Sequence, residues 1–316
     1  MTALGIAITL FTALVLVIEF RRHQKIALPP YGWSAATLLV VAEILMFRGV
    51  RPISVYFTPI AWTTYIFLAD AGVYAMRGES RMHRAPRELL NIALLSVPLW
   101  LIFEAYNLRL QNWTYVGVPQ QLGLELLGYG WSFATITPGI LETADLIEAF
   151  GWFHPTKPAR MSRQLEFVMM ALGACCLIVP VVVPQDLARY LFVLVWLGVF
   201  FLLDPMNHWL RLPSILGDFE AGRRSRFYSL LLSGFVCGWF WEFWNYWATA
   251  KWYYIFPMFQ NLKIFEMPAP GFLGFLPFAL ECFVMCITAQ WLVGRLKSGH
   301  KSVSSEQPRS QSTALR

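Results

Sequence analysis

Four glutamates lie within long apolar stretches of the sequence: Glu104, Glu142, Glu242 and Glu281. An ionisable side chain at the centre of a bilayer costs about 3 kcal/mol or more, so an intramembrane acid is a functional hypothesis by default. A carboxyl group removed from water holds its proton more tightly and can then donate it at neutral pH. We therefore take these glutamates as candidate catalytic acids.

Aromatic and amide side chains accompany the acids, most densely in the stretch WFWEFWNYWATAKWYY that begins at Trp239. Trp and Tyr are typical of membrane–water interfaces, but their faces also stabilise a developing carbocation. An Asn three residues after a Glu shares its helical face and can donate to the carboxylate or to a ligand. The candidate substrate-binding residues are Asn107, Trp113, Tyr115, Trp241, Asn245, Trp252 and Tyr254.

The same short motifs occur twice along the chain, which predicts an internal repeat. Each second copy follows the first by 134 to 139 residues, and the order is kept: Trp62-x7-Asp70 and Trp196-x7-Asp204, Glu104-x2-Asn107 and Glu242-x2-Asn245, Trp113-x-Tyr115 and Trp252-x-Tyr254, Pro138-x3-Glu142 and Pro277-x3-Glu281. Each unit holds four apolar runs, so both units enter the membrane in the same direction. This predicts a parallel repeat about an axis along the membrane normal.

Two prolines and two aspartates have supporting roles in this interpretation. Pro138 and Pro277 each precede an acid by four residues, where a proline kinks a helix and frees a carbonyl to face a cavity. Asp70 and Asp204 lie near the ends of apolar runs, just before basic loops. We expect these aspartates to form ion pairs or helix caps rather than a site.

The elements that carry these residues are membrane helices. The chain is 57% hydrophobic and 14% charged, whereas a soluble domain is about a quarter charged. The composition predicts an all-α polytopic membrane helix bundle. Nine runs have spanning length, at about 3–20, 32–48, 54–76, 88–108, 129–151, 165–184, 187–206, 227–248 and 271–295.

The basic residues set the expected orientation. Lys and Arg concentrate in the first, third, fifth and seventh loops and after the last run. The positive-inside rule then places these loops and the C-terminus in the cytoplasm and the N-terminus outside. The net charge of +6 belongs to these loops, so we predict no nucleic-acid partner and expect a protein of a bacterial inner membrane.

The predicted organisation has four parts. Residues 1–30 form one span and a basic loop, 31–151 form repeat A, 165–296 form repeat B, and 298–316 form a disordered tail rich in Ser, Gln, Lys and Arg. The five cysteines lie in apolar runs without a set of histidines, so we predict neither a metal nor a disulfide. The sequence has no dinucleotide-binding glycine fingerprint and no P-loop, so we predict no cofactor.

One stretch resembles a known family. KWYYIFPMFQNLKIFEMPAPGFLGFLPFALECF, which begins at Lys251, has W-x-Y followed about 25 residues later by a Pro and a Glu near an aromatic residue. It is similar to the repeat unit of the membrane-integral, heterodimer-type lycopene cyclases, although the spacing here is Pro-x3-Glu without a second acid directly after it. The resemblance implies a non-redox carotenoid cyclisation with Glu142 and Glu281 as the acids.

Two classes of function fit these residues. Acids within an aromatic lining suit cyclisation or isomerisation of an isoprenoid, with a membrane lipid or lipid-like molecule as the substrate. Parallel repeats, proline-broken helices and midplane acids are equally typical of a proton- or cation-coupled transporter. A non-catalytic membrane scaffold and a homo-oligomer stay open as further alternatives. Within the enzyme hypothesis, the four glutamates converge on one cavity at the repeat interface.

Overall fold

The computed structural model describes residues 1–304, with side chains described through residue 296. Within this part, nine helices have 18 residues or more, one for each predicted span: α1 Thr2–His23, α2 Pro30–Phe47, α3 Phe57–Arg77, α5 Pro86–Leu110, α6 Leu122–Ala149, α7 Arg163–Val182, α9 Phe192–Trp209, α11 Ser225–Trp247 and α12 Phe275–Ser304. The prediction of an all-α membrane bundle is therefore confirmed.

The helices divide into two kinds. Six segments are long and apolar enough to cross a membrane: α1, α2, α5, α7, α9 and Ala269–Leu296. The remaining long helices, α3, α6 and α11, fall outside this set, and α3 and α11 bury most of their side chains. In the outer helices large apolar side chains such as Phe11 and Val168 are 65% and 62% exposed, as expected for surfaces that contact lipid tails.

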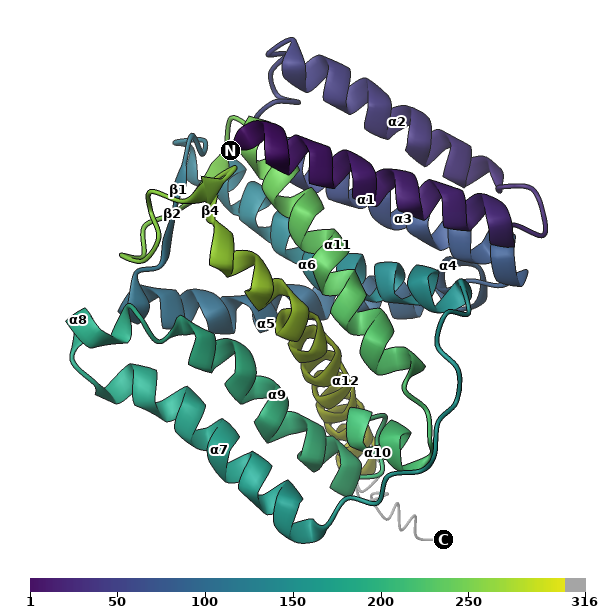
Figure 1. Ribbon diagram of the computed structural model, residues 1–316, viewed down its shortest axis with the longest axis vertical. Helices are drawn as coiled ribbons and strands as arrows, with labels where there is room; N and C mark the ends of the chain where they lie inside the picture. Colours follow the sequence, from purple (N-terminus) through teal and green to yellow (C-terminus); the bar gives the residue numbers. More distant parts are fainter. Residues whose placement is uncertain (305–316) are drawn as a thin grey trace, which may run out of the picture.

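The long helices pack in three groups. Figure 1 shows α1, α2 and α3 on one side of the molecule, α7 and α9 on the opposite side, and α5, α6, α11 and α12 between them. Small residues permit the closest approach: a Cβ on Gly173 of α7 would lie 2.5 Å from the Leu202 nitrogen of α9. Close backbone packing of this kind drives helix association in lipid, where apolar burial gives little advantage.

One end of the bundle carries the short helices α4 (Arg81–Arg84) and α10 (Ile215–Glu220), and we call it the short-helix end. Asp70 accepts hydrogen bonds from Tyr31, Ser80 and the Met82 backbone nitrogen. Asp204 accepts from the backbone nitrogens of Ile215 and Leu216, at 2.7 and 3.0 Å. Each aspartate thus holds the N-terminus of the short helix that follows it.

The opposite end, which we call the ribbon end, carries a two-stranded antiparallel ribbon. Strand β1 (Trp113–Val116) follows α5, and β2 (Lys251–Tyr254) follows α11. Trp113 faces Tyr254 and Tyr115 faces Trp252 across the ladder. Helix α8 (Gln185–Ala188), strands β3 (Lys263–Ile264) and β4 (Met267–Pro268), and the 3-10 helix η1 (Ala269–Gly274) complete the described elements.

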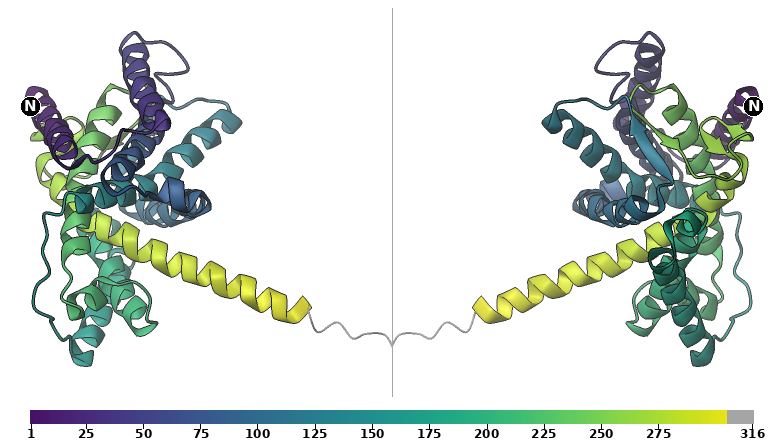
Figure 2. Two further views of the ribbon diagram at one scale, coloured as in Figure 1. Left: turned by 90° about the vertical axis from the view of Figure 1, so that its right-hand side faces the viewer. Right: turned by 90° about the vertical axis from the view of Figure 1, so that its left-hand side faces the viewer.

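Two expectations need correction around α12. Pro277 lies in the first turn of this helix, where an N–H would have no intrahelical partner, so it does not kink the span. Pro138, in contrast, lies inside α6. Helix α12 continues to Ser304 and projects away from the other helices (Figure 2), so the first residues of the expected tail at 298–316 are helical. Residues 305–316 lie outside the described part.

Candidate functional site

Glu104 lies at the ribbon end of α5 inside a cage of hydrogen-bond donors. Its Oε1 accepts from the Trp100 Nε1 at 2.8 Å, the Trp113 Nε1 at 3.2 Å and the Tyr115 hydroxyl at 2.5 Å. Two of these donors belong to the W-x-Y motif of β1. The acid therefore fixes the rings of the strand that follows its own helix.

Glu242 of α11 has the corresponding set of contacts in the second half of the chain. Its Oε1 accepts from the Trp252 Nε1 at 3.3 Å and the Tyr254 hydroxyl at 2.9 Å. The side chain is fully buried, and its Oε2 has no partner among the described residues. Like Glu104, it holds a tryptophan and a tyrosine of the adjacent strand.

The two asparagines fasten the strands to their helices. Asn107 Oδ1 accepts from the backbone nitrogens of Asn112 and Trp113, and its Nδ2 donates to the Trp113 carbonyl. Asn245 brackets Trp252 in the same way, with 2.9 Å to the backbone nitrogen and 3.0 Å to the carbonyl. The Glu-x2-Asn and W-x-Y motifs therefore form one hydrogen-bonded unit in each half.

The ribbon tyrosines are held as neutral donors. Burial, followed by the charge of the adjacent Glu104, raises the pKa of Tyr115 well above its ordinary value. Burial and the charge of Glu242 raise the pKa of Tyr254 in the same direction. Both hydroxyl groups therefore keep their protons and continue to donate to the glutamates over the physiological pH range.

Glu142 lies near the opposite end of the bundle, beside Arg81 of α4. The Arg81 Nε is 3.0 Å from the Glu142 Oε1, and its Nη2 is 2.5 Å from Asp145. Only 1% of Glu142 is exposed, and an ion pair is the usual way to hold a buried carboxylate. This acid belongs to a charged cluster that also neighbours Asp70.

Glu281 of α12 is the counterpart of Glu142, but its surroundings differ. It is fully buried, and neither carboxylate oxygen has a side-chain partner in the described part of the chain. Ile215 occupies the place in the second half that Arg81 has in the first, since each follows the capping serine of its short helix, Ser214 or Ser80. The four glutamates therefore do not converge on one cavity.

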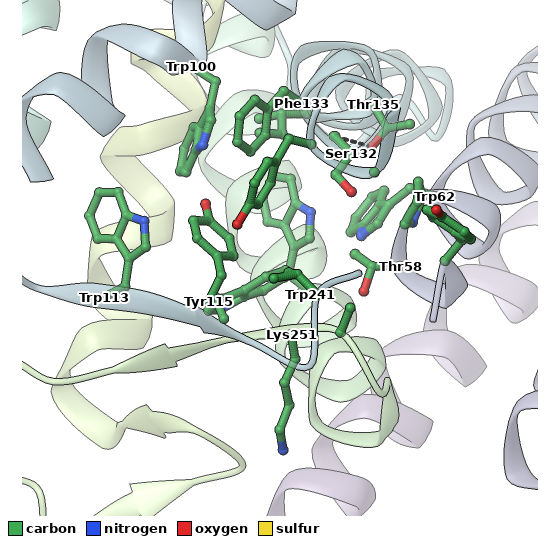
Figure 3. A pocket seen from close by; sticks show the side chains of 18 of the residues that line it. Thr58, Trp62, Trp100, Trp113, Tyr115, Ser132, Phe133, Thr135, Trp241 and Lys251 are labelled. Atoms are coloured by element: carbon green, nitrogen blue, oxygen red, sulfur yellow. Dashed lines mark hydrogen bonds between the residues drawn. The ribbon is translucent and has the colours of Figure 1, made fainter. Parts of the chain in front are cut away.

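A cavity of about 140 Å³ lies at the ribbon end between α3 and α6. We call it the α3–α6 cavity. Six tryptophans line it: Trp62, Trp100, Trp113, Trp196, Trp241 and Trp252. Tyr115, Tyr254, Phe133 and Phe278 contribute further rings, and Figure 3 shows Tyr115 and Trp241 directed at the same space as Trp62 and Trp100.

The polar groups of this cavity are few. Thr58 of α3 and Ser132 and Thr135 of α6 supply hydroxyl groups, and Glu125 is the one acid in its lining within the described residues. Lys251 also belongs to the lining, but its ammonium group points away from the rings (Figure 3) and pairs with Glu266 at 2.6 Å. The interior is therefore apolar and aromatic, with hydroxyl groups on one side.

A second cavity, of about 340 Å³, lies between α9 and η1, and we call it the α9–η1 cavity. The offsets found in the sequence relate its lining to that of the first. Phe192, Val193 and Trp196 stand 134 residues after Thr58, Pro59 and Trp62, and Gly271 and Gly274 stand 139 residues after Ser132 and Thr135. The α9–η1 cavity thus has a Phe or a Gly at each of the three positions where the α3–α6 cavity has a hydroxyl group.

The predicted site residues separate into two layers. Trp113, Tyr115, Trp241, Trp252 and Tyr254 line the α3–α6 cavity. Asn107, Asn245 and the four glutamates do not line either cavity. Glu104 and Glu242 instead lie behind the rings that they hold, so these two acids act on the wall of the cavity.

Sequence reasoning missed several lining residues. Trp62 and Trp196 were part of the repeat but were not assigned to a site, although their recurrence at matching positions was a usable signal. Trp100 precedes Glu104 by one helical turn and could have been found as its donor. Thr58, Glu125 and Ser132 carry no motif that marks them in the sequence.

Comparison with family models, curated proteins and solved structures gave no match. Within the described residues no group of three or more His, Cys, Asp or Glu side chains is placed to hold a metal ion. The five cysteines are free thiols. The candidate site is therefore described from its own geometry.

Proposed function

We propose that this integral membrane protein holds an elongated apolar lipid of the isoprenoid kind in the α3–α6 cavity. The observation that carries the proposal is the lining of six tryptophans around one open cavity. Small-molecule sites are typically concave, predominantly apolar and equipped with a few polar groups that fix orientation. A polar solute would find few partners here, whereas a methyl-branched polyene would contact ring faces along its length.

We further propose that the ligand is converted by a non-redox proton transfer, as in cyclisation or isomerisation. The acid in position for this step is Glu125 of α6, because it is the carboxyl group in the cavity lining. Tyr129, one turn further along α6, also lines the cavity and interacts with Glu125. Ring faces such as that of Trp241 would stabilise a cation that forms on protonation of a double bond.

The two-unit organisation is part of the proposal. Units 31–151 and 165–296 are related by an axis through the centre of the ribbon. The matched Glu-x2-Asn and W-x-Y contacts and the related linings of the two cavities support this. The basic loops gather at the short-helix end: the Lys25 nitrogen donates to the Ala75 carbonyl, and the Thr156 nitrogen to the Gly222 carbonyl. We assign this end to the cytoplasm and the ribbon end to the outer leaflet.

Two measurements test this function. The first is equilibrium binding of a radiolabelled polyprenyl hydrocarbon to the purified protein in lipid nanodiscs, where saturable binding is expected. The second is the lipid extract of a host that makes linear isoprenoids, with and without the protein. A new product that Glu125→Gln abolishes supports proton transfer. Absence of saturable binding contradicts the proposal as a whole.

The alternative is a proton- or cation-coupled transporter, and one observation favours it. Glu281 is a fully buried acid that has no side-chain partner among the described residues, as expected for a carboxyl group that takes up and releases a proton. Proton-coupled uptake by proteoliposomes, lost in Glu281→Gln, would support this alternative. Uptake that is the same in the variant and the parent would exclude Glu281 as the coupling acid.

A further inference from the structure

Two polar groups in the α3–α6 cavity have no partner of their own. The Thr58 Oγ1 and the Trp62 Nε1 are buried without a hydrogen-bond partner among the described residues. Thr58 is 7% exposed and Trp62 is 0% exposed, and both side chains line the cavity. Buried polar groups in proteins are nearly always hydrogen-bonded, so an unpartnered pair in one cavity calls for an explanation.

The two groups are placed to act together. They stand four residues apart on α3, which puts them on one face of the helix one turn from each other. Figure 3 shows both side chains on the same side of the cavity, with Ser132 of α6 close to them. The Thr135 hydroxyl is already used, because it donates to the Ser132 carbonyl at 2.7 Å. Thr58 and Trp62 are therefore buried donors of this cavity that no described group occupies.

The fold itself does not require this polar set. In the α9–η1 cavity the counterpart of Thr58 is Phe192, and the counterpart of Ser132 is Gly271. Trp62 has a tryptophan counterpart in Trp196, so the ring is common to both cavities while the hydroxyl groups are not. The hydroxyl groups thus distinguish one cavity from a related one with the same framework.

We infer that Thr58 and Trp62 together donate hydrogen bonds to one neutral carbonyl oxygen of the ligand, so that the α3–α6 cavity prefers an oxygenated isoprenoid to a hydrocarbon. The inference rests on the proposed function and deepens it. An indole N–H only donates, and a carbonyl oxygen has two lone pairs that accept two donors. Within the described residues no free cation lines this cavity to hold an anion, since the Lys251 ammonium pairs with Glu266.

The test compares two lipids of equal chain length, a polyprenyl methyl ketone and the corresponding polyprenyl hydrocarbon. Equilibrium binding of each radiolabelled lipid is measured with the full chain in nanodiscs. The parent protein is expected to bind the ketone about tenfold more tightly, which is the effect of one or two neutral hydrogen bonds in an apolar site. Thr58→Val keeps the shape of the side chain and is expected to remove most of this preference.

Ser229→Ala is the matched control, because the Ser229 hydroxyl is also buried without a partner but lies in α11 outside both cavities. It is expected to leave the preference unchanged. Ser132→Ala is a second cavity variant in case Thr58→Val folds poorly, and it is expected to weaken ketone binding by a smaller factor.

The outcomes distinguish failure of the inference from failure of the proposed function. Equal affinity of the parent for both lipids, or an unchanged preference in both Thr58→Val and Ser132→Ala, overturns the inference and leaves the proposed function standing. Failure of both lipids to bind overturns the proposed function and the inference with it. A tenfold preference that Thr58→Val removes and Ser229→Ala retains supports both.

Discussion

Thr114 and Tyr253 face each other across the β1–β2 ladder, and they are also the two positions that the 139-residue offset of the W-x-Y motifs relates. In the proposed two-unit organisation, a pair that is both a ladder partner and a repeat partner lies on the axis that relates the two units. On either side of this pair, the tryptophan of one W-x-Y motif faces the tyrosine of the other: Trp113 faces Tyr254, and Tyr115 faces Trp252. The ribbon thus joins the two halves at one end.

The first prediction concerns the two ribbon tyrosines. Tyr254→Phe leaves the fully buried Glu242 with Trp252 as its remaining side-chain donor, whereas Tyr115→Phe leaves the half-buried Glu104 with both Trp100 and Trp113. We expect Tyr254→Phe to lower the free energy of unfolding by about 1 to 3 kcal/mol, and by more than Tyr115→Phe does. Thermal unfolding in detergent, followed by tryptophan fluorescence, measures the order. A larger effect of Tyr115→Phe would contradict this assignment.

The second prediction concerns alkaline pH. The folded-state pKa values of Tyr115 and Tyr254 are raised above the ordinary value near 10. Below about pH 10 the tyrosines are neutral in both states, so they add no pH dependence. As the pH rises further, the unfolded chain loses these protons first, and stability falls until the folded pKa values are passed. The double variant Tyr115→Phe, Tyr254→Phe should show a shallower fall of melting temperature above pH 10 than the parent, and an equal slope would refute the account.

The third prediction separates Glu142 from Glu281. Glu142→Gln removes one of the two close carboxylates that face Arg81, and we expect it to lower the free energy of unfolding by about 2 kcal/mol. Glu281→Gln breaks no ion pair of the described residues, and it replaces a buried carboxyl group by a neutral amide. We therefore expect no loss of stability. Melting temperatures of the two variants in detergent provide the comparison. The reverse order would show that Glu281, not Glu142, is the paired acid.

The fourth prediction concerns the aspartate at the short-helix end of α9. Both carboxylate oxygens of Asp204 accept from backbone nitrogens of α10. Asp204→Asn keeps one acceptor and places an NH₂ group against a backbone N–H. We expect a loss of about 1 to 2 kcal/mol and faster hydrogen exchange of α10 amides, with Glu79→Gln as an exposed control. Unchanged exchange in α10 would show that Asp204 does not cap this helix.

Much of the fold could be predicted because the bilayer imposes it. Each of the nine predicted runs overlaps one long helix of the structure, since a backbone in lipid must satisfy its own hydrogen bonds. The register of the ribbon could not be predicted. W-x-Y is too short to mark a strand, and its strand geometry depends on Asn107 and Asn245, which act through contacts several residues away.

The site could be predicted in part. The aromatic residues of the W-x-Y motifs and Trp241, which the sequence marks as candidate substrate-binding residues, line the α3–α6 cavity. Depth along a helix, however, does not say which way a side chain points. Glu142 is three residues from Asp145 and lies by Arg81 at the short-helix end, while Glu242 turns toward the ribbon behind the cavity wall. Only the packed structure separates the acids that line a cavity from those that hold its wall.

The central claim is that the α3–α6 cavity holds the lipid, and blocking it is the most direct test. Ser132→Trp directs a large ring into this cavity, whereas Gly130→Trp adds the same ring two residues away, where a Cβ meets open space. Binding of the radiolabelled polyprenyl hydrocarbon in nanodiscs should fall at least about tenfold in Ser132→Trp and stay at the parent level in Gly130→Trp. Equal binding by Ser132→Trp and the parent would contradict the account.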